Sequence, residues 1–167
     1  MKAEILTILK EADDYVSGQE LCEKFGVSRT AVWKAMNQLK KEGYEIESVQ
    51  NRGYKLISTP DILSENELVS IRKTEWIGKE IHYYDVTDST NTRAKSLGEG
   101  DAPHGSLVVA DMQQSGKGRR GRSFISPAGT GIFMTLLLKP EVQPQNASML
   151  TLVAAMAVVK GMERSVG

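Results

Sequence analysis

The sequence predicts a two-part α+β protein: a winged helix-turn-helix over residues 1–58 and a mixed α/β domain over residues 59–167. Three observations support this fold class. Two capped helical patterns meet at a tight turn, and two short strand patterns flank an Asn-Arg-Gly turn. After Pro60 the pattern changes to strands that alternate with helices, which is typical of a mixed α/β domain.

Composition sets limits on the class of protein. A chain of 167 residues fits one domain or two small ones, and 40% hydrophobic with 25% charged residues is ordinary for a soluble globular protein. The formal net charge is zero, so no whole-molecule field attracts the chain to nucleic acid or to a membrane. Any basic chemistry must therefore be local.

The compartment is indicated by cysteine usage and by the apolar segments. Cys22 is the single cysteine, which excludes an internal disulfide and fits a reducing compartment. The N-terminus is charged and amphipathic, unlike a signal peptide. The apolar stretch at residues 150–159 is too short to span a bilayer. We expect a cytoplasmic protein without a membrane partner.

The N-terminal part should begin with two helices. The first covers residues 2–12, where apolar residues recur at helical spacing. The second begins at Gly18, because Ser17 and Glu20 form a capping box, and it ends at Gly26, which can adopt the left-handed conformation.

A third helix capped by Ser28 has the features of a DNA recognition helix. Residues 28–41 hold four cations and no acid, and cations bind phosphates while Asn, Gln and Arg read base edges. The strand patterns at 44–49 and 54–57 complete the wing. The expected DNA contacts are Ser28, Arg29, Thr30, Trp33, Lys34, Asn37 and, at the wing tip, Arg52. The alternative is a helical interaction domain with a solvated basic face.

The second part should contain a capped helix from Ser64, three strands, and two further helices. Asp88 or Ser89 can cap the helix that ends near Gly98, and a long apolar helix runs from residue 146. We expect strands at residues 80–86, 105–112 and 130–140.

Two polar features could bind a ligand. The first is Ser89-Thr90-Asn91, where free backbone N–H groups and short polar side chains meet at a strand-to-helix turn. The alternative is ordinary helix capping. The second is "SGKGRRGRSF" at residues 115–124, with four cations, three glycines and no acid.

This basic stretch partly matches the phosphate-binding pattern G-x-x-x-x-G-K-[ST], with Arg122 in place of the lysine. A true P-loop leads into a helix, whereas Pro127, Gly129 and Gly131 prevent one here. We therefore expect a flexible loop that binds a polyphosphate, an adenylate or nucleic acid. A basic loop without a ligand is the alternative.

The combination of a winged helix, "DSTN" and "GSLVVADMQQSGKGRRGRSFISPAGTGIFMTLLL" resembles the bifunctional biotin protein ligases, the biotin operon repressors. That family has a Ser-Thr-Asn turn, a Gln, and a Gly-Arg-Gly-Arg-Arg-Gly-Arg loop. Here Lys117 stands where the family often has Arg, and Phe124 where it usually has Trp. Lys117 loses the planar fork of arginine. The resemblance implies the first part of a biotin/lipoate ligase-like catalytic domain.

The resemblance also implies an activity. Biotin and ATP, with Mg²⁺, would form biotinyl-5′-AMP, and a lysine in the acceptor domain of acetyl-CoA carboxylase would take the biotin. The adenylate would favour a homodimer that represses transcription at a two-fold operator in DNA. No metal bound by the protein itself is expected.

Site residues follow from the resemblance by position. Lys117, Arg119 and Arg122 would be the catalytic cations, with Arg122 first among the phosphate contacts. The loop would become ordered over the ligand. The expected biotin and adenylate contacts are Ser89, Thr90, Asn91, Gln113, Gly116, Lys117, Gly118, Arg119, Arg120, Gly121, Arg122 and Phe124.

The family's Lys-Trp-Pro-Asn-Asp motif does not occur in these 167 residues. We therefore expect an N-terminal portion of the enzyme, inactive by itself. Two other hypotheses stay open. One is a non-enzymatic biotin-sensing regulator, and the other is a basic loop that acts as a second nucleic-acid contact.

Overall fold

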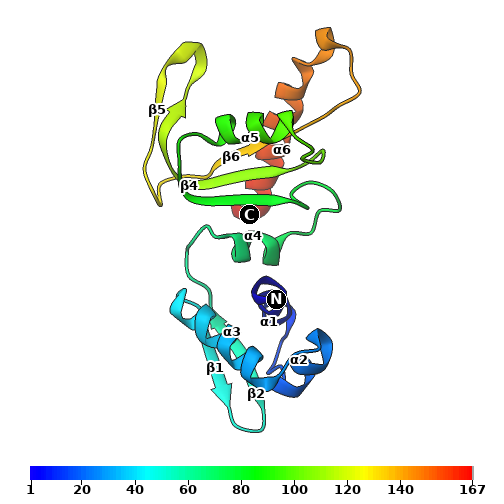
Figure 1. Ribbon diagram of the computed structural model, residues 1–167, viewed down its shortest axis with the longest axis vertical. Coiled ribbons are helices and arrows are strands. Elements are labelled where there is room, and N and C mark those ends of the chain that lie inside the picture. Colours follow the sequence, from blue (N-terminus) through cyan, green and yellow to red (C-terminus); the bar gives the residue numbers. More distant parts are fainter. Residues whose placement is uncertain (167) are drawn as a thin grey trace. The chain divides into compact units, whose positions relative to one another are not determined.

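The winged helix-turn-helix predicted from the sequence is present. The structure is a computed structural model that describes residues 1–166. Three helices are followed by an antiparallel hairpin (Figure 1). These elements are α1 (Lys2–Glu11), α2 (Gly18–Phe25), α3 (Arg29–Lys41), β1 (Glu45–Val49) and β2 (Gly53–Ser58).

The predicted caps form. The Ser17 hydroxyl accepts from the Glu20 amide at 3.0 Å, and the Ser28 hydroxyl accepts from the Ala31 amide at 3.3 Å. Gly26 ends α2 with φ +62°. Each cap satisfies one amide that a helix start leaves without an intrahelical partner, so the caps set where α2 and α3 begin.

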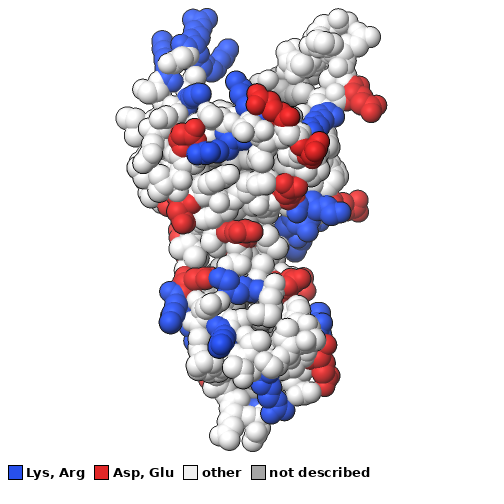
Figure 2. Space-filling view, viewed as in Figure 1, with Lys and Arg blue, Asp and Glu red and all other residues white. Residues whose placement is uncertain are grey.

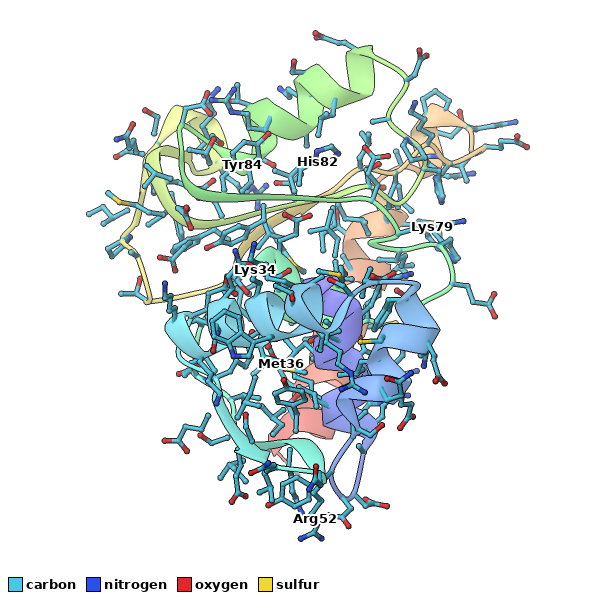
Figure 3. The ribbon with its side chains drawn as sticks, turned by 60° about the horizontal axis from the view of Figure 1, so that its bottom comes forward. Lys34, Met36, Arg52, Lys79, His82 and Tyr84 are labelled. Carbon is cyan, nitrogen blue, oxygen red and sulfur yellow. The ribbon has the colours of Figure 1, made fainter. Side chains whose placement is uncertain are left out.

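One apolar cluster holds the three helices and the hairpin together. Met36 and Leu39 on α3 are buried as predicted, and Tyr44 closes the cluster on the hairpin side. Figure 3 shows Met36 among the helices, whereas Arg52 lies at the end of the hairpin. The buried members are Ile5, Leu6, Leu9, Val16, Leu21, Val32, Ala35, Met36, Leu39, Tyr44 and Ile46.

The wing is fixed to the segment that precedes α2. Val16 forms an isolated antiparallel bridge with Tyr54, with backbone hydrogen bonds of 2.8 and 2.9 Å. Gly53 takes φ +122° at this crossing, and a Cβ there would lie 2.1 Å from the Val16 carbonyl oxygen. Only glycine fits this position.

Helix α4 (Glu65–Ile71) contacts α1 through polar groups. Lys10 forms an ion pair with Glu67, and the Tyr44 hydroxyl donates to the other Glu67 oxygen at 2.7 Å. Burial, followed by the Glu67 carboxylate, raises the pKa of Tyr44. The predicted cap of α4 is confirmed, since the Ser64 hydroxyl accepts from the Glu67 amide. The domain boundary at residue 58 stays a prediction.

A four-stranded sheet follows, and its central strand is β4 (Leu107–Lys117). Strand β3 (Ile81–Thr87) pairs with β4 in parallel. On the other side of β4, β5 (Ser123–Ser126) and β6 (Phe133–Leu136) pair antiparallel with its second and first halves. One strand thus connects the whole sheet.

The structure corrects the predicted extent of two strands and adds a third. β4 continues to Lys117, well past residue 112, and β6 covers only Phe133–Leu136 within the predicted 130–140. The sequence does not predict β5, because "SFIS" is short and is followed by helix-breaking residues. It forms because Gly116 and Lys117 pair with Phe124 and Ser123.

Helix α5 (Thr90–Glu99) covers one face of the sheet (Figure 1). Ala94 is its buried contact, and the Arg93 guanidinium lies 5.6 Å from the centre of the Tyr84 ring. Figure 3 shows His82 and Tyr84 between the strands and this helix. The helix begins at Thr90, shortly after the carboxyl end of β3 at Thr87.

Within the described residues, 138–166 form a second compact unit. Its described elements are the short 3₁₀ turn η2 (Pro144–Asn146) and α6 (Met149–Val166), the long apolar helix predicted from residue 146. Many apolar side chains of α6 are exposed, among them Leu152 and Met162. Within the described residues, no helix has the length and hydropathy needed to cross a membrane.

The wing crossing gives a test of the fold. We expect Gly53→Ala to lower the free energy of unfolding by clearly more than Gly26→Ala. The control glycine also has positive φ, at +62°, but a Cβ there meets nothing within 4 Å. Gly26→Ala should cost about 1–2 kcal/mol from backbone strain alone. Urea unfolding followed by far-ultraviolet circular dichroism measures both, and equal losses would contradict the close contact with Val16.

Candidate functional site

The Ser-Thr-Asn turn lies where β3 ends and α5 begins. Ser89 occupies the N-cap position as predicted, but its side chain accepts no hydrogen bond from the helix. The expectation that the side chain of Asp88 or Ser89 caps α5 is therefore wrong for Ser89. A residue from another strand fills this role.

Gln113 on β4 caps the helix across the sheet. Its side-chain oxygen accepts from the Thr90 amide at 2.8 Å and from the Thr90 hydroxyl at 3.1 Å. An amide at the first turn of a helix has no partner within the helix, and Gln113 satisfies the Thr90 amide from the central strand of the sheet. The turn is thus anchored to the centre of the sheet.

A chain of hydrogen bonds extends from this anchor over three strands. The Gln113 amide nitrogen donates to the Ser126 hydroxyl on β5 at 3.0 Å. On the other side, the Thr135 hydroxyl of β6 lies 3.0 Å from both the Thr90 hydroxyl and the Asn91 side-chain oxygen. A network this complete holds its side chains in fixed positions.

Ser89 is the exception in this network. The residue is fully buried, and its hydroxyl oxygen has no hydrogen-bond partner among residues 1–166. A buried hydroxyl without a partner costs free energy, because it has lost its bonds to water. The Ser89 hydroxyl is therefore a buried polar group whose hydrogen-bonding capacity is unmet among residues 1–166.

Asp88 precedes the turn with a stable negative charge. A hydrogen bond from the Ser89 amide, followed by the one from the Thr87 hydroxyl and by the charge of Arg93, lowers the pKa of Asp88. Its carboxylate lies 3.1 Å from the Arg93 guanidinium, and its carbonyl accepts from the Ser115 amide at 2.8 Å. Asp88 thus links the turn to the start of the basic segment.

The basic segment forms the tip of a β-hairpin between β4 and β5, and we call residues 115–124 the basic hairpin. The Gly118 amide donates to the Arg122 carbonyl at 2.8 Å, which closes the tip around the short 3₁₀ turn Arg119–Gly121. Gly116 lies so close to β5 that a Cβ would be 2.4 Å from the Phe124 carbonyl oxygen. The predicted flexible loop is therefore an ordered hairpin at its base.

The cations of the basic hairpin are exposed. Figure 2 shows Lys and Arg side chains gathered at the tip of the β4–β5 hairpin. Among residues 1–166, no acidic side chain forms an ion pair with any of these four cations. They are Lys117, Arg119, Arg120 and Arg122. An anionic ligand would thus not have to displace a carboxylate.

The structure brings part of the predicted site together. Gln113 joins the Ser-Thr-Asn turn by direct hydrogen bonds, and the basic hairpin extends from the same strand. Sequence reasoning missed Ser126 and Thr135. Neither belongs to a local pattern, because their partners lie 13 and 45 residues away.

The outer face of α3 carries the predicted DNA contacts. Trp33 is 57% exposed, and Lys34 and Asn37 line a shallow hollow with Gln38, Lys40 and Lys41. Arg29 donates to the Gln19 side-chain oxygen at 3.1 Å, so α2 holds it in place. Thr30 is exposed on the same helix.

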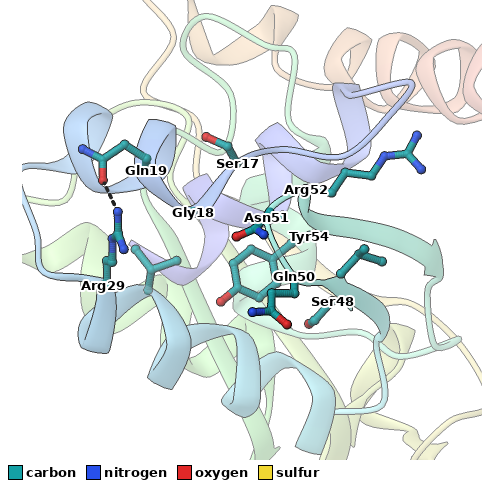
Figure 4. Close-up of a pocket in the computed structure, with 12 residues that line it drawn as sticks. Ser17, Gly18, Gln19, Arg29, Ser48, Gln50, Asn51, Arg52 and Tyr54 are labelled. Carbon is teal, nitrogen blue, oxygen red and sulfur yellow. Dashed lines mark hydrogen bonds between the residues drawn. The ribbon is translucent and has the colours of Figure 1, made fainter.

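A groove separates the start of α3 from the wing (Figure 4). Arg29 lies on one side, and Gln50 and Asn51 on the other. Arg52 extends away from this groove in Figure 4, and its guanidinium meets the Asp14 carboxylate at 3.1 Å.

Comparison with known proteins finds a match for each of the two parts of the chain. Residues 2–55 match the HTH domain, and residues 83–166 match the biotin/lipoate A/B protein ligase family. The chain is 43% identical over its whole length to the bifunctional ligase/repressor BirA of Bacillus subtilis, covering 52% of that protein. It is 30% identical to the bifunctional ligase/repressor BirA of Escherichia coli, over 88% of this chain and 44% of that protein.

A solved structure is also similar in part: the biotin protein ligase from Aquifex aeolicus in complex with biotin and ATP. It shares 36% identity over 38% of this chain and 25% of that chain, with a TM-score of 0.33. The chain spans about half the length of the curated relatives it matches. The predicted resemblance is confirmed, and the chain belongs to the biotin/lipoate A/B protein ligase family.

Proposed function

We propose that the protein carrying this sequence is a biotin–protein ligase. It would make biotinyl-5′-AMP from biotin and MgATP, and would transfer biotin to a lysine in the acceptor domain of acetyl-CoA carboxylase. The observation that carries the proposal is the unpartnered Ser89 hydroxyl, beside a turn anchored by Gln113 on the strand that leads to the basic hairpin.

The Ser-Thr-Asn turn suits the uncharged polar end of biotin. Ser89 would give its free hydroxyl to the ligand, while Thr90, Asn91 and Gln113 provide the rigid polar wall around it. A ligand that bonds to a preformed group loses little free energy to ordering of the protein. Family membership supports biotin as the ligand.

The basic hairpin suits the phosphates. Adenylate formation needs no nucleophile from the protein, because the biotin carboxylate attacks the α-phosphorus and pyrophosphate leaves. The protein must hold the two reactants together and stabilise the negative charge that develops on the phosphate oxygens. Lys117, Arg119 and Arg122 would do the second, with Arg120, Gly116, Gly118 and Gly121 shaping the hairpin and Phe124 packing at its base.

Closure of the hairpin tip over the adenylate would also exclude water from the reactive anhydride. The paired base of the hairpin supports this step, since only the tip between Gly118 and Arg122 would have to move.

A second function is supported by the winged helix: binding of operator DNA as a biotin-responsive repressor. The basic outer face of α3, with no acid between residues 28 and 41, carries this proposal. A homodimer favoured by the adenylate would place two recognition helices on two half-sites. A cytoplasmic location is part of the same proposal.

Ser89 gives a test with two readouts. We expect Ser89→Ala to lower biotin affinity about tenfold, since one buried hydrogen bond to the ligand is lost. Without ligand, the free energy of unfolding should stay equal or rise, because the removed hydroxyl has no partner. Isothermal titration calorimetry and urea unfolding measure the two effects.

The control is Ser106→Ala. Ser106 is equally buried, but its hydroxyl donates to the Pro103 carbonyl at 2.8 Å. This variant should lose stability and keep its biotin affinity. A loss of unliganded stability in Ser89→Ala as large as in the control would show that Ser89 is satisfied without a ligand.

The hairpin cations are tested by biotin-dependent ATP–pyrophosphate exchange. The assay uses a protein that contains this sequence and is as long as the curated relatives. We expect Arg119→Ala and Arg122→Ala to slow exchange at least about tenfold, because each removes a donor for the developing charge. Lys95→Ala, which removes an exposed cation of α5, should leave the rate unchanged.

Biotin binding without any exchange in that longer protein would instead favour the non-enzymatic regulator. A large loss of DNA binding by Arg119→Ala in the absence of biotin would favour the basic hairpin as a nucleic-acid contact.

The recognition helix is tested by titration of duplex DNA. Lys34→Ala should weaken binding and reduce the slope of log affinity against log salt by about one, because one phosphate contact is lost. Lys79→Ala removes an exposed cation outside the winged helix and should have little effect. Unchanged binding by both Lys34→Ala and Arg29→Ala would favour an interaction domain.

A further inference from the structure

Arg52, the predicted phosphate contact of the wing, is engaged within the protein. One guanidinium nitrogen donates to both oxygens of Asp14, each at 3.1 Å. The guanidinium carbon also lies 4.2 Å from the centre of the Tyr15 ring. Figure 4 shows the side chain directed away from the groove between α3 and the wing.

The partners of Arg52 are themselves fixed. The Tyr15 hydroxyl donates to the Glu47 carboxylate on β1 at 2.6 Å, and the Lys55 ammonium nitrogen lies 5.9 Å from the centre of the Tyr15 ring. Val16 follows at once and bonds to the wing through Tyr54. Residues 14–16 therefore form one edge of the wing, so Asp14 is held at the position where Arg52 ends.

The chemistry of this pair is that of a phosphate contact. A carboxylate and a phosphate oxygen present similar acceptors to a guanidinium. A hydrogen bond from the Tyr15 amide, followed by the one from Arg52, lowers the pKa of Asp14, so the carboxylate stays charged at neutral pH. Both side chains are more than half exposed, at 57% and 66%, and exposed pairs are weak enough for another anion to displace.

We propose that Asp14 is an intramolecular competitor that occupies Arg52 in place of a DNA phosphate and so limits the affinity of the winged helix for DNA. This inference rests on the proposed DNA-binding function. On binding, the phosphate takes over the guanidinium, and the released Asp14 carboxylate takes up a cation from solution. That uptake partly cancels the counterion release that drives association with DNA.

The experiment compares Asp14→Asn with Asp13→Asn in the whole chain. Asp13 is an exposed neighbour with the same charge, and it forms no ion pair or side-chain hydrogen bond within residues 1–166. The probe is a fluorescein-labelled duplex of about 30 base pairs of mixed sequence, which reports phosphate contacts without knowledge of the operator. Fluorescence anisotropy is measured over a series of salt concentrations.

We expect Asp14→Asn to tighten binding about threefold to fivefold over Asp13→Asn at low salt. It should also steepen the slope of log affinity against log salt by about one, because cation uptake by the carboxylate is removed. In the Arg52→Ala background, Asp14→Asn should lose this advantage, since the carboxylate then has no guanidinium to occupy. Circular dichroism confirms that each variant is folded.

Three outcomes overturn the inference. Equal affinities for Asp14→Asn and Asp13→Asn would show only a general charge effect. Weaker binding by Asp14→Asn would show that Asp14 orients Arg52 for DNA. An advantage that survives in the Arg52→Ala background would assign the effect to another group. In each case, the proposed DNA-binding function remains supported if the wild type binds the duplex and Lys34→Ala weakens that binding. Absence of any duplex binding by the wild type would remove both.

Discussion

The candidate ligand site depends on the Gln113 side chain, which accepts two hydrogen bonds from Thr90. It satisfies the Thr90 amide at the start of α5 from the central strand of the sheet, whereas the Ser89 hydroxyl accepts no hydrogen bond from the helix. The Gln113 amide nitrogen also donates to the Ser126 hydroxyl on β5. One side chain thus anchors the turn to the central strand, beside a buried Ser89 hydroxyl that has no partner among residues 1–166.

The basic hairpin depends on the same strand. Because β4 continues to Lys117 and pairs with β5, the segment has an ordered base and a short tip that carries the arginines. The cost of ordering a few tip residues is small compared with that of a long disordered loop. Charge-assisted hydrogen bonds between the arginines and ligand phosphates would offset this ordering cost.

For the proposed DNA binding by the winged helix, the positions of the charges matter more than the net charge of the chain. The chain has no net charge, yet the outer face of α3 is basic and Arg29 is held by Gln19. At the wing, the guanidinium of Arg52 is neutralised by Asp14. Affinity for DNA should therefore depend on which cations are free to meet phosphates.

The sequence by itself determined the helices of the winged helix and the starts of α2, α3 and α4, because the bonds at Ser17, Ser28 and Ser64 join groups three residues apart. It also determined the family, through the "DSTN" turn and the basic stretch. Only the tertiary structure decided that Gln113 caps α5, that β5 exists, and that Arg52 meets Asp14. These contacts join residues 23, 13 and 38 positions apart, and such pairings depend on how strands and loops meet in space.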